Sequence, residues 1–228
     1  MLDLSAQDLT AIALSLKVAS VATLTALPVA VGVGYALARW RFPGHAALNA
    51  LVHLPLVLPP VVTGFLLLLL FGRHGPLGAF LADTFGLVFS FRWTGAALAA
   101  AVMSFPLMVR PARLAFEAVD PRLSHAARTL GANRAWAFTL VDLPLASSGV
   151  IVGAILGFAK ALGEFGATIT FVSSIPGETR TIPAAIYALI QTPDGDGSAL
   201  RLAAISAVIA VGALLAAEAL QARMGRRA

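Results

Sequence analysis

The sequence predicts an all-α, polytopic membrane protein, because it is strongly apolar, its apolar residues stand in long runs, and its arginines stand mostly between those runs. Of its 228 residues, 59% are hydrophobic and 12% are charged, and the mean hydropathy of +0.88 is too high for a soluble domain with a wettable surface. Crossing about 30 Å of hydrocarbon as a helix takes roughly 20 residues, so candidate spans can be counted directly. Nothing marks a domain boundary, and residues 1–228 are expected to form one membrane domain.

Five runs meet this length and composition. They are residues 18–38, 48–71, 94–115, 143–163 and 202–222. A sixth span could be drawn over residues 77–91, but Asp83, Gly86 and the flanking arginines make it a poor one. We therefore expect about five transmembrane helices, with six as the alternative.

The charges orient these spans. Under the positive-inside rule, arginines mark the loop after the first span, the loop after the third span and the C-terminal tail as cytoplasmic. These residues are Arg39, Arg41, Arg110, Arg113, Arg122, Arg128, Arg134, Arg223, Arg226 and Arg227. The N-terminal residues carry Asp3 and Asp8 and no basic residue, unlike a cleaved signal peptide, so we expect the N-terminus outside. An odd number of spans then leaves the C-terminus in the cytoplasm.

The second span opens with three prolines, Pro55, Pro59 and Pro60. Proline removes a backbone donor and obstructs the preceding helical turn. Broken helix at membrane depth is tolerated only where protein or a water-filled cavity satisfies the freed carbonyl groups. The prolines therefore predict either a kink that lines a pathway or an ordinary helix start at the interface, where prolines in the first turn cost little.

A polar segment, residues 118–142, separates the third and fourth spans. Asp120 can cap free backbone N–H groups, Pro121 suits a first helical turn, and Gly131 is a natural helix end, which together predict a helix of about ten residues outside the lipid. Small residues on this helix allow close approach to a groove on another protein, and its arginines can pair with acidic groups there. The alternative is a solvated amphipathic linker.

Lys160 and Glu164 stand near the end of the fourth span. Their i, i+4 spacing places both charges on one helix face. Charges at membrane depth are usually functional, so Lys160 could line a route for an anion while Glu164 balances it. The alternative is a structural ion pair, or a lysine that reaches to the interface.

The segment after the fourth span is broken by turn-forming residues. Pro176, Gly177 and Pro183 end any helix there, and the following residues 184–191 are too few to cross the membrane. We predict a re-entrant or surface scoop on the outer side.

The sequence argues against several other classes of protein. The net charge of +5 is not gathered with aromatic residues on one water-facing surface, so we expect no nucleic-acid partner. No Gly-x-x-x-x-Gly-Lys-Ser/Thr loop is present, so ATP hydrolysis would need a separate chain. There are no cysteines and the four histidines are scattered, and we therefore expect no catalytic residue, no bound cofactor and no metal site.

The polar segment resembles the cytoplasmic "EAA" loop of bacterial ABC-importer permeases. The residues that carry the resemblance are Ala126, Ala127, Gly131, Val141, Leu143 and Pro144. The resemblance implies that the helix docks on an ATP-hydrolysing subunit and transmits its motion. The residues implied in this coupling are Asp120, Arg122, His125, Ala126, Ala127, Arg128, Gly131 and Pro144. His125 stands where the family usually has glutamate, which puts the customary charge pairing in doubt.

Further segments are similar to the molybdate-permease branch of that family. They are residues 58–64, 72–78, 117–120, 161–171 and 176–193. The Leu-Gly-Glu-Phe-Gly part of 161–171 is shared with sulfate permeases, whereas 176–193 is the sharper signal. The resemblance implies a type I ABC importer permease fold in the bacterial inner membrane, which moves molybdate and often tungstate. It implies three kinds of partner: a second copy of this chain, two cytoplasmic ABC ATPase subunits that use ATP and Mg, and a periplasmic molybdate-binding protein.

The same resemblance implies alternating access. Because the chain shows no repeat of two similar halves, a homodimer is the simplest source of the paired bundles that this mechanism needs. The predicted pathway residues are Pro59, Pro60, Thr63, Lys160, Glu164, Thr168 and Thr170. Two alternatives stay open: import of sulfate or thiosulfate, and a passive channel or scaffold without an ATPase.

Overall fold

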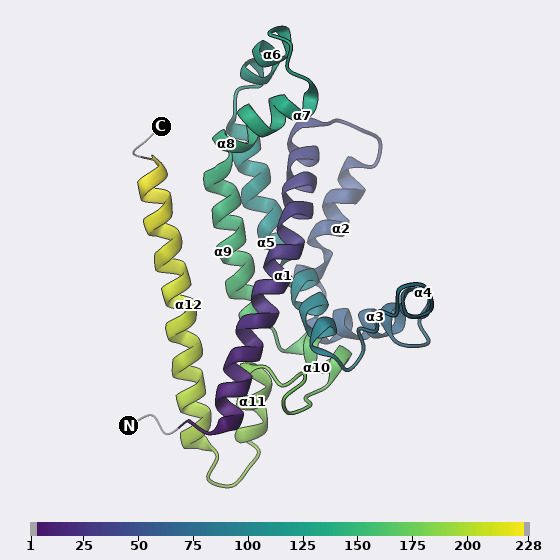
Figure 1. Ribbon diagram of the computed structural model, residues 1–228, viewed down its shortest axis with the longest axis vertical. Helices are drawn as coiled ribbons and strands as arrows, with labels where there is room; N and C mark the ends of the chain where they lie inside the picture. Colours follow the sequence, from purple (N-terminus) through teal and green to yellow (C-terminus); the bar gives the residue numbers. More distant parts are fainter. Residues whose placement is uncertain (1–3, 226–228) are drawn as a thin grey trace.

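The computed structural model describes residues 4–225, with side chains for residues 4–216, 218 and 219. In this part of the chain every regular element is helical, which confirms the predicted all-α class. The elements are α1 (Ala6–Arg39), α2 (His45–Val57), α3 (Pro60–Phe71), α4 (Pro76–Phe85), α5 (Trp93–Ala118), α6 (Pro121–Thr129), α7 (Arg134–Ala137), the π-helix η1 (Phe138–Asp142), α8 (Leu143–Leu145), α9 (Ser147–Leu162), α10 (Gly166–Val172), α11 (Ile182–Leu189) and α12 (Asp196–Gly225). Figure 1 shows an elongated bundle in which α1, α5, α9 and α12 run lengthwise.

Three helices of the described chain are long and apolar enough to cross a membrane alone, namely α1, α5 and α12. They contain the predicted spans 18–38, 94–115 and 202–222. Two further spans are obtained only if each of two sharply bent helix pairs is taken as one, which gives up to five.

Small residues let α1, α5 and α9 approach closely. Ala19 and Ala22 of α1 share a buried core with Ala96 and Ala100 of α5. On α9, a Cβ added to Gly153 would lie 2.8 Å from the carbonyl oxygen of Met108, so only glycine fits at this contact. Since lipid tails are as apolar as leucine, close packing of backbones is what holds helices together in a membrane.

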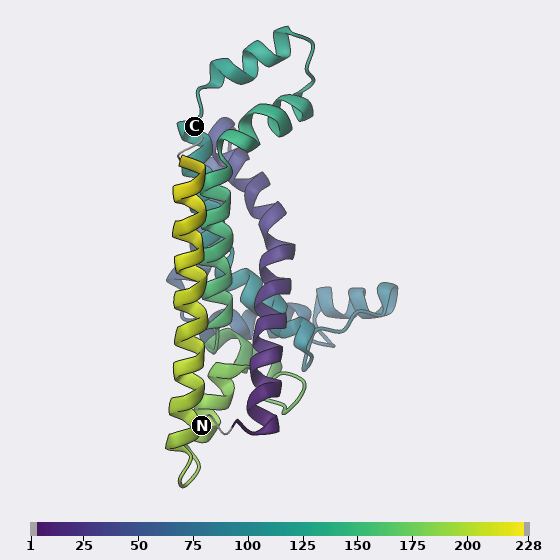
Figure 2. The same ribbon diagram turned by 60° about the vertical axis from the view of Figure 1, so that its left-hand side comes forward.

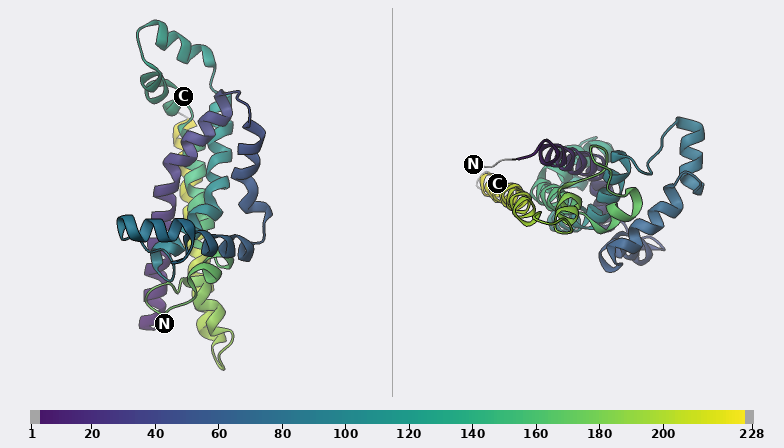
Figure 3. Two further views of the ribbon diagram at one scale, coloured as in Figure 1. Left: turned by 90° about the vertical axis from the view of Figure 1, so that its right-hand side faces the viewer. Right: turned by 90° about the horizontal axis from the view of Figure 1, so that it is seen from below.

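The span predicted over residues 48–71 is formed by two helices, α2 and α3, with a sharp break between them at the predicted prolines Pro59 and Pro60. The chain bends by 115° between α2 and α3. Pro60 is the first residue of α3, and Pro59 before it is extended with ψ of 135°, so the α2 helix cannot continue through this point. Figures 1 and 3 show α3 and α4 projecting sideways from the bundle. With ten residues, α4 is also too short to make 77–91 a sixth span.

The fourth predicted span, 143–163, also begins differently from the prediction. The chain bends by 72° between the helical stretch Arg134–Leu145, which contains η1, and α9. Pro144 has no N–H to donate, and Ala146 leaves the helical conformation with ψ of 2°, so a new helix starts at Ser147. α9 therefore has 16 residues.

The two ends of the bundle carry different elements. α6 and α7 lie beyond one end, and Figure 2 shows them overhanging it. The start of α1 lies with α11 at the other end, whereas the C-terminal end of α12 is on the α6 side. Asp3, Arg226 and Arg227, which entered the orientation argument, lie outside the described residues, as does the side chain of Arg223.

Candidate functional site

α6 is exposed at its end of the bundle, and none of its residues is buried. Asp120 caps it, because the Asp120 carboxylate accepts a hydrogen bond from the Arg122 backbone N–H at 2.9 Å. Gly131 follows its last turn with φ of +97°, in the left-handed region that favours glycine. The helix predicted between Asp120 and Gly131 is therefore confirmed.

Most of the residues predicted for coupling share this helix. Arg122, His125, Ala126 and Arg128 are exposed on α6, and Ala127 is half-buried. Pro144 instead lies on α8, where it contributes to the bend before α9. The structure thus presents a short helix of small and basic residues whose exposed surface can meet another molecule.

The base of α6 is fastened by a carboxylate that sequence reasoning missed. Asp142 is 1% exposed and accepts three side-chain hydrogen bonds. Ser124 Oγ of α6 donates at 2.6 Å, Arg39 Nη2 of α1 at 3.2 Å, and the Tyr35 hydroxyl of α1 at 3.3 Å. Arg39 Nη2 also donates to the Val119 carbonyl at 3.0 Å. The signal in the sequence was a lone aspartate in an apolar stretch, Val141-Asp142-Leu143.

An aromatic cluster lies against this carboxylate. The Tyr35 ring makes edge contacts with Phe116 at 5.2 Å and Phe138 at 4.8 Å between centroids. Phe116 is fully buried. Together with the hydrogen bonds to Asp142, these rings join the end of α1, the end of α5 and η1.

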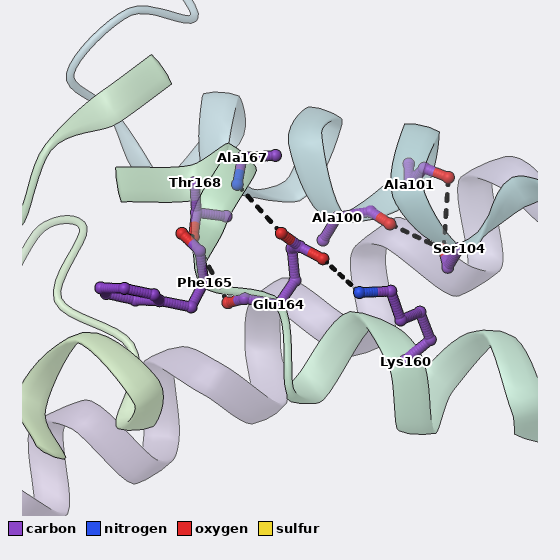
Figure 4. A network of polar contacts seen from close by, with 8 residues as sticks. All are labelled: Ala100, Ala101, Ser104, Lys160, Glu164, Phe165, Ala167 and Thr168. Atoms are coloured by element: carbon purple, nitrogen blue, oxygen red, sulfur yellow. Dashed lines mark hydrogen bonds and ion pairs between the residues drawn. The ribbon is translucent and has the colours of Figure 1, made fainter. Parts of the chain in front are cut away.

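The opposite half of the bundle holds a second buried carboxylate, at the break between α9 and α10. Figure 4 shows Glu164 between Lys160 and the first turn of α10. Lys160 Nζ donates to Glu164 Oε2 at 2.6 Å, and the Ala167 backbone N–H donates to Glu164 Oε1 at 3.0 Å. The Glu164 side chain is 1% exposed and that of Lys160 is 30% exposed. Glu164 therefore caps α10 as well as pairing with Lys160.

The predicted pathway residues on α3 and α10 come together in space. A Cβ on Gly166 would lie 2.7 Å from Pro60 Cβ, which shows how tightly the two helices pack. Thr168 and Thr170 donate to carbonyl groups of their own segment, Phe165 and Gly166, each at 2.8 Å. Thr63 is buried, and within the described residues its hydroxyl has no partner.

These elements belong to a known kind of protein. Residues 28–226 match the family described as binding-protein-dependent transport system inner membrane component. The chain belongs to this family. It is 58% identical over 216 residues to the molybdenum transport system permease protein ModB of Escherichia coli, which covers 95% of this chain and 94% of that protein. The protein of the same name from Haemophilus influenzae is 49% identical over 220 residues, with 96% of each chain covered.

The fold of this inner membrane component is also that of solved transporters. It superposes with a TM-score of 0.76 on a chain of a bacterial alginate ABC transporter in complex with alginate pentasaccharide-bound periplasmic protein. The match covers 96% of this chain and 80% of that one, at 20% identity, and so concerns the fold alone. The predicted ABC-importer permease fold is thereby confirmed.

Proposed function

We propose that this chain is the membrane-spanning permease subunit of an ATP-driven importer of molybdate, with tungstate as a second substrate. The coupling part of this proposal rests on α6, a helix that is capped by Asp120, has no buried residue and lies beyond one end of the bundle. The substrate part is supported by the similarity to molybdenum permeases over nearly the whole chain. ATP and Mg²⁺ are used by a separate ATPase subunit, since this sequence has no phosphate-binding loop.

In the proposed mechanism, ATP binding closes two cytoplasmic ATPase subunits, which draw together the α6 helices of two permease copies. The paired bundles then open outward and accept an anion from a periplasmic molybdate-binding protein. After ATP hydrolysis, the cavity between the paired bundles opens to the cytoplasm again and releases the anion. Arg122 and Arg128 on α6 can pair with acidic groups of the ATPase, whereas His125 does not supply the negative charge of the glutamate that the family usually has there.

The proposal of a second copy of this chain is supported by the apolar side chains that are exposed on one copy. The sideways arm of α3 and α4 exposes large apolar side chains. They are Val61, Val62, Phe65, Leu66, Leu69, Leu70, Leu77, Phe80 and Phe85. α12 is also peripheral, with 11% of its most apolar window buried. A homodimer would cover part of this surface and supply the second bundle for alternating access.

The proposed orientation places α6 in the cytoplasm of a cell with this protein in its inner membrane. Because the start of α1 lies at the end opposite α6, the N-terminus is then outside. The end of α12 lies on the α6 side and is then cytoplasmic, in agreement with the arginines of the tail.

Uptake by proteoliposomes tests this proposal. The chain is reconstituted with its cognate ATPase and binding protein, and uptake of molybdate, tungstate and sulfate is measured with and without ATP. We expect ATP-dependent molybdate and tungstate uptake, and ATPase activity raised by the loaded binding protein. If sulfate is taken up in preference to molybdate, sulfate is the substrate and the proposed molybdate specificity is wrong. Uptake that is independent of ATP would favour a passive channel.

A further inference from the structure

Four separate parts of the chain meet at the Asp142 carboxylate. Arg39 and Tyr35 belong to α1, Ser124 to the coupling helix α6, and Asp142 itself to η1. Val119, at the end of α5, joins through its carbonyl group. A nearly fully buried charge is costly unless it is paired and hydrogen-bonded, and here the donors come from elements far apart in sequence.

Ser124 has a special position in this cluster. Among the described residues, its 2.6 Å bond to Asp142 is the one side-chain hydrogen bond that joins α6 to another element. The other hydroxyl of the helix, Thr129, donates to Ala126 within α6 itself. Apart from this bond, α6 is connected to the bundle by its two chain ends and by packing on its neighbours α7 and η1.

We infer that Ser124, Asp142 and Arg39 form a fastening that makes the end of α1 move with the coupling helix. The inference rests on the proposed function, in which α6 receives the motion of an ATPase. Without the fastening, that motion would reach the bundle through α5 and through the turn before α9. With it, a displacement of α6 also acts on Arg39 at the end of α1, through the Asp142 carboxylate that both Ser124 and Arg39 bind. Ser124 and Asp142 are therefore positioning residues.

The other end of α1 contacts α11, so a movement of α1 would also reach the opposite end of the bundle. Ser15, near the start of the helix, accepts a buried hydrogen bond from the Ile182 backbone N–H of α11 at 2.7 Å. Arg39 lies 24 positions after Ser15, which corresponds to about 36 Å along a helix at 1.5 Å per residue. A movement of α1 driven from α6 is thus delivered to α11, on the side where the binding protein would arrive.

The first test measures the fastening in the permease alone. Because the chain has no cysteine, Leu130→Cys at the end of α6 and Arg41→Cys beyond α1 can carry two spin labels. Labelled copies are diluted with unlabelled ones, and the distance distribution is recorded by pulsed electron paramagnetic resonance. We expect Ser124→Ala to broaden the distribution, while Ser124→Thr, which keeps a hydroxyl, and the control Thr129→Ala leave it narrow. An unchanged distribution in Ser124→Ala would overturn the inference.

The second test measures coupling in the complete transporter. We expect Ser124→Ala to raise the ATP hydrolysed per anion imported about tenfold, the factor set by loss of a hydrogen bond to a charged group. Thr129→Ala should keep the ratio, and Ser124→Thr should restore it. A broadened distance with an unchanged ratio would refute the role in coupling. If the unmodified complex imports no anion with ATP, the proposed function fails, and the distance measurement still decides whether the fastening exists.

Discussion

Two of the buried carboxylates, Asp142 and Glu164, have different structural roles. Both are nearly fully buried and both pair with a basic side chain. Asp142 binds partners 18, 103 and 107 positions away. Glu164 binds Lys160, four positions before it, and Ala167, three positions after it. One carboxylate joins distant elements, whereas the other stabilises a break between two consecutive helices.

This difference shows which contacts, long-range or local, hold the helices in place at each end of the bundle. At the α6 end, the relative placement of α1, α6 and η1 depends on one tertiary cluster. At the α9–α10 break, the polar contacts of the carboxylate are local, because Glu164 at the start of α10 satisfies a free backbone N–H group of that helix. Substitution of Asp142 should therefore destabilise contacts between several helices, whereas substitution of Glu164 should mainly affect the break between α9 and α10.

The largest effect is expected from Asp142→Ala. This change removes the carboxylate that accepts from Arg39 and from two hydroxyl groups, and should lower the free energy of unfolding by about 3 kcal/mol. Asp120→Ala is the control, since Asp120 is an exposed carboxylate that makes one local capping bond, which is worth about 1 kcal/mol. Unfolding of the purified chain in detergent measures both. Equal losses would contradict a special role of Asp142.

The next effect concerns transport. Lys160→Met with Glu164→Gln removes both charges at the break while leaving no buried charge unpaired. If this pair lines the pathway, uptake should fall about tenfold, because the cation that attracts the anion is lost. Arg113→Met with Glu117→Gln is a matched control, since these residues form another i, i+4 pair at 2.7 Å. Uptake equal to that of this control would remove Lys160 and Glu164 from the pathway and leave them a structural role.

How far the sequence predicts this molecule depends on how local each feature is. The spans within α1, α5 and α12 follow from length and hydropathy, and α6 follows from Asp120, Pro121 and Gly131, all readable within a few residues. The 115° bend between α2 and α3 cannot be predicted in this way, because prolines predict a break but not the direction in which the chain continues. The Asp142 cluster cannot be predicted either, since no spacing rule relates Asp142 to Arg39, 103 positions away.

A smaller effect on stability is expected from Glu164→Gln alone. The amide oxygen can still accept from Ala167, while Lys160 is 30% exposed and can turn to water, so the loss should be about 1 kcal/mol. Glu117→Gln in the exposed pair should change stability by less than about 0.5 kcal/mol. Unfolding in detergent compares the two. A loss as large as that from Asp142→Ala would end the distinction between the two carboxylates.

A change in stability of only about 0.5 kcal/mol is expected from Thr63→Cys, because the buried Thr63 hydroxyl has no partner within the described residues and no hydrogen bond is lost with it. If α3 and α10 line the pathway, Thr63→Cys or Thr168→Cys should react with a small water-soluble thiol reagent in at least one nucleotide state. Ser104→Cys is the control, because Ser104 is fully buried in α5 and donates to Ala100 within its own helix. The native chain adds no background, since it has no cysteine. Lack of reaction at both threonine positions in every state would mean that the lining lies elsewhere, and the break at Glu164 would then be a packing feature of the bundle alone.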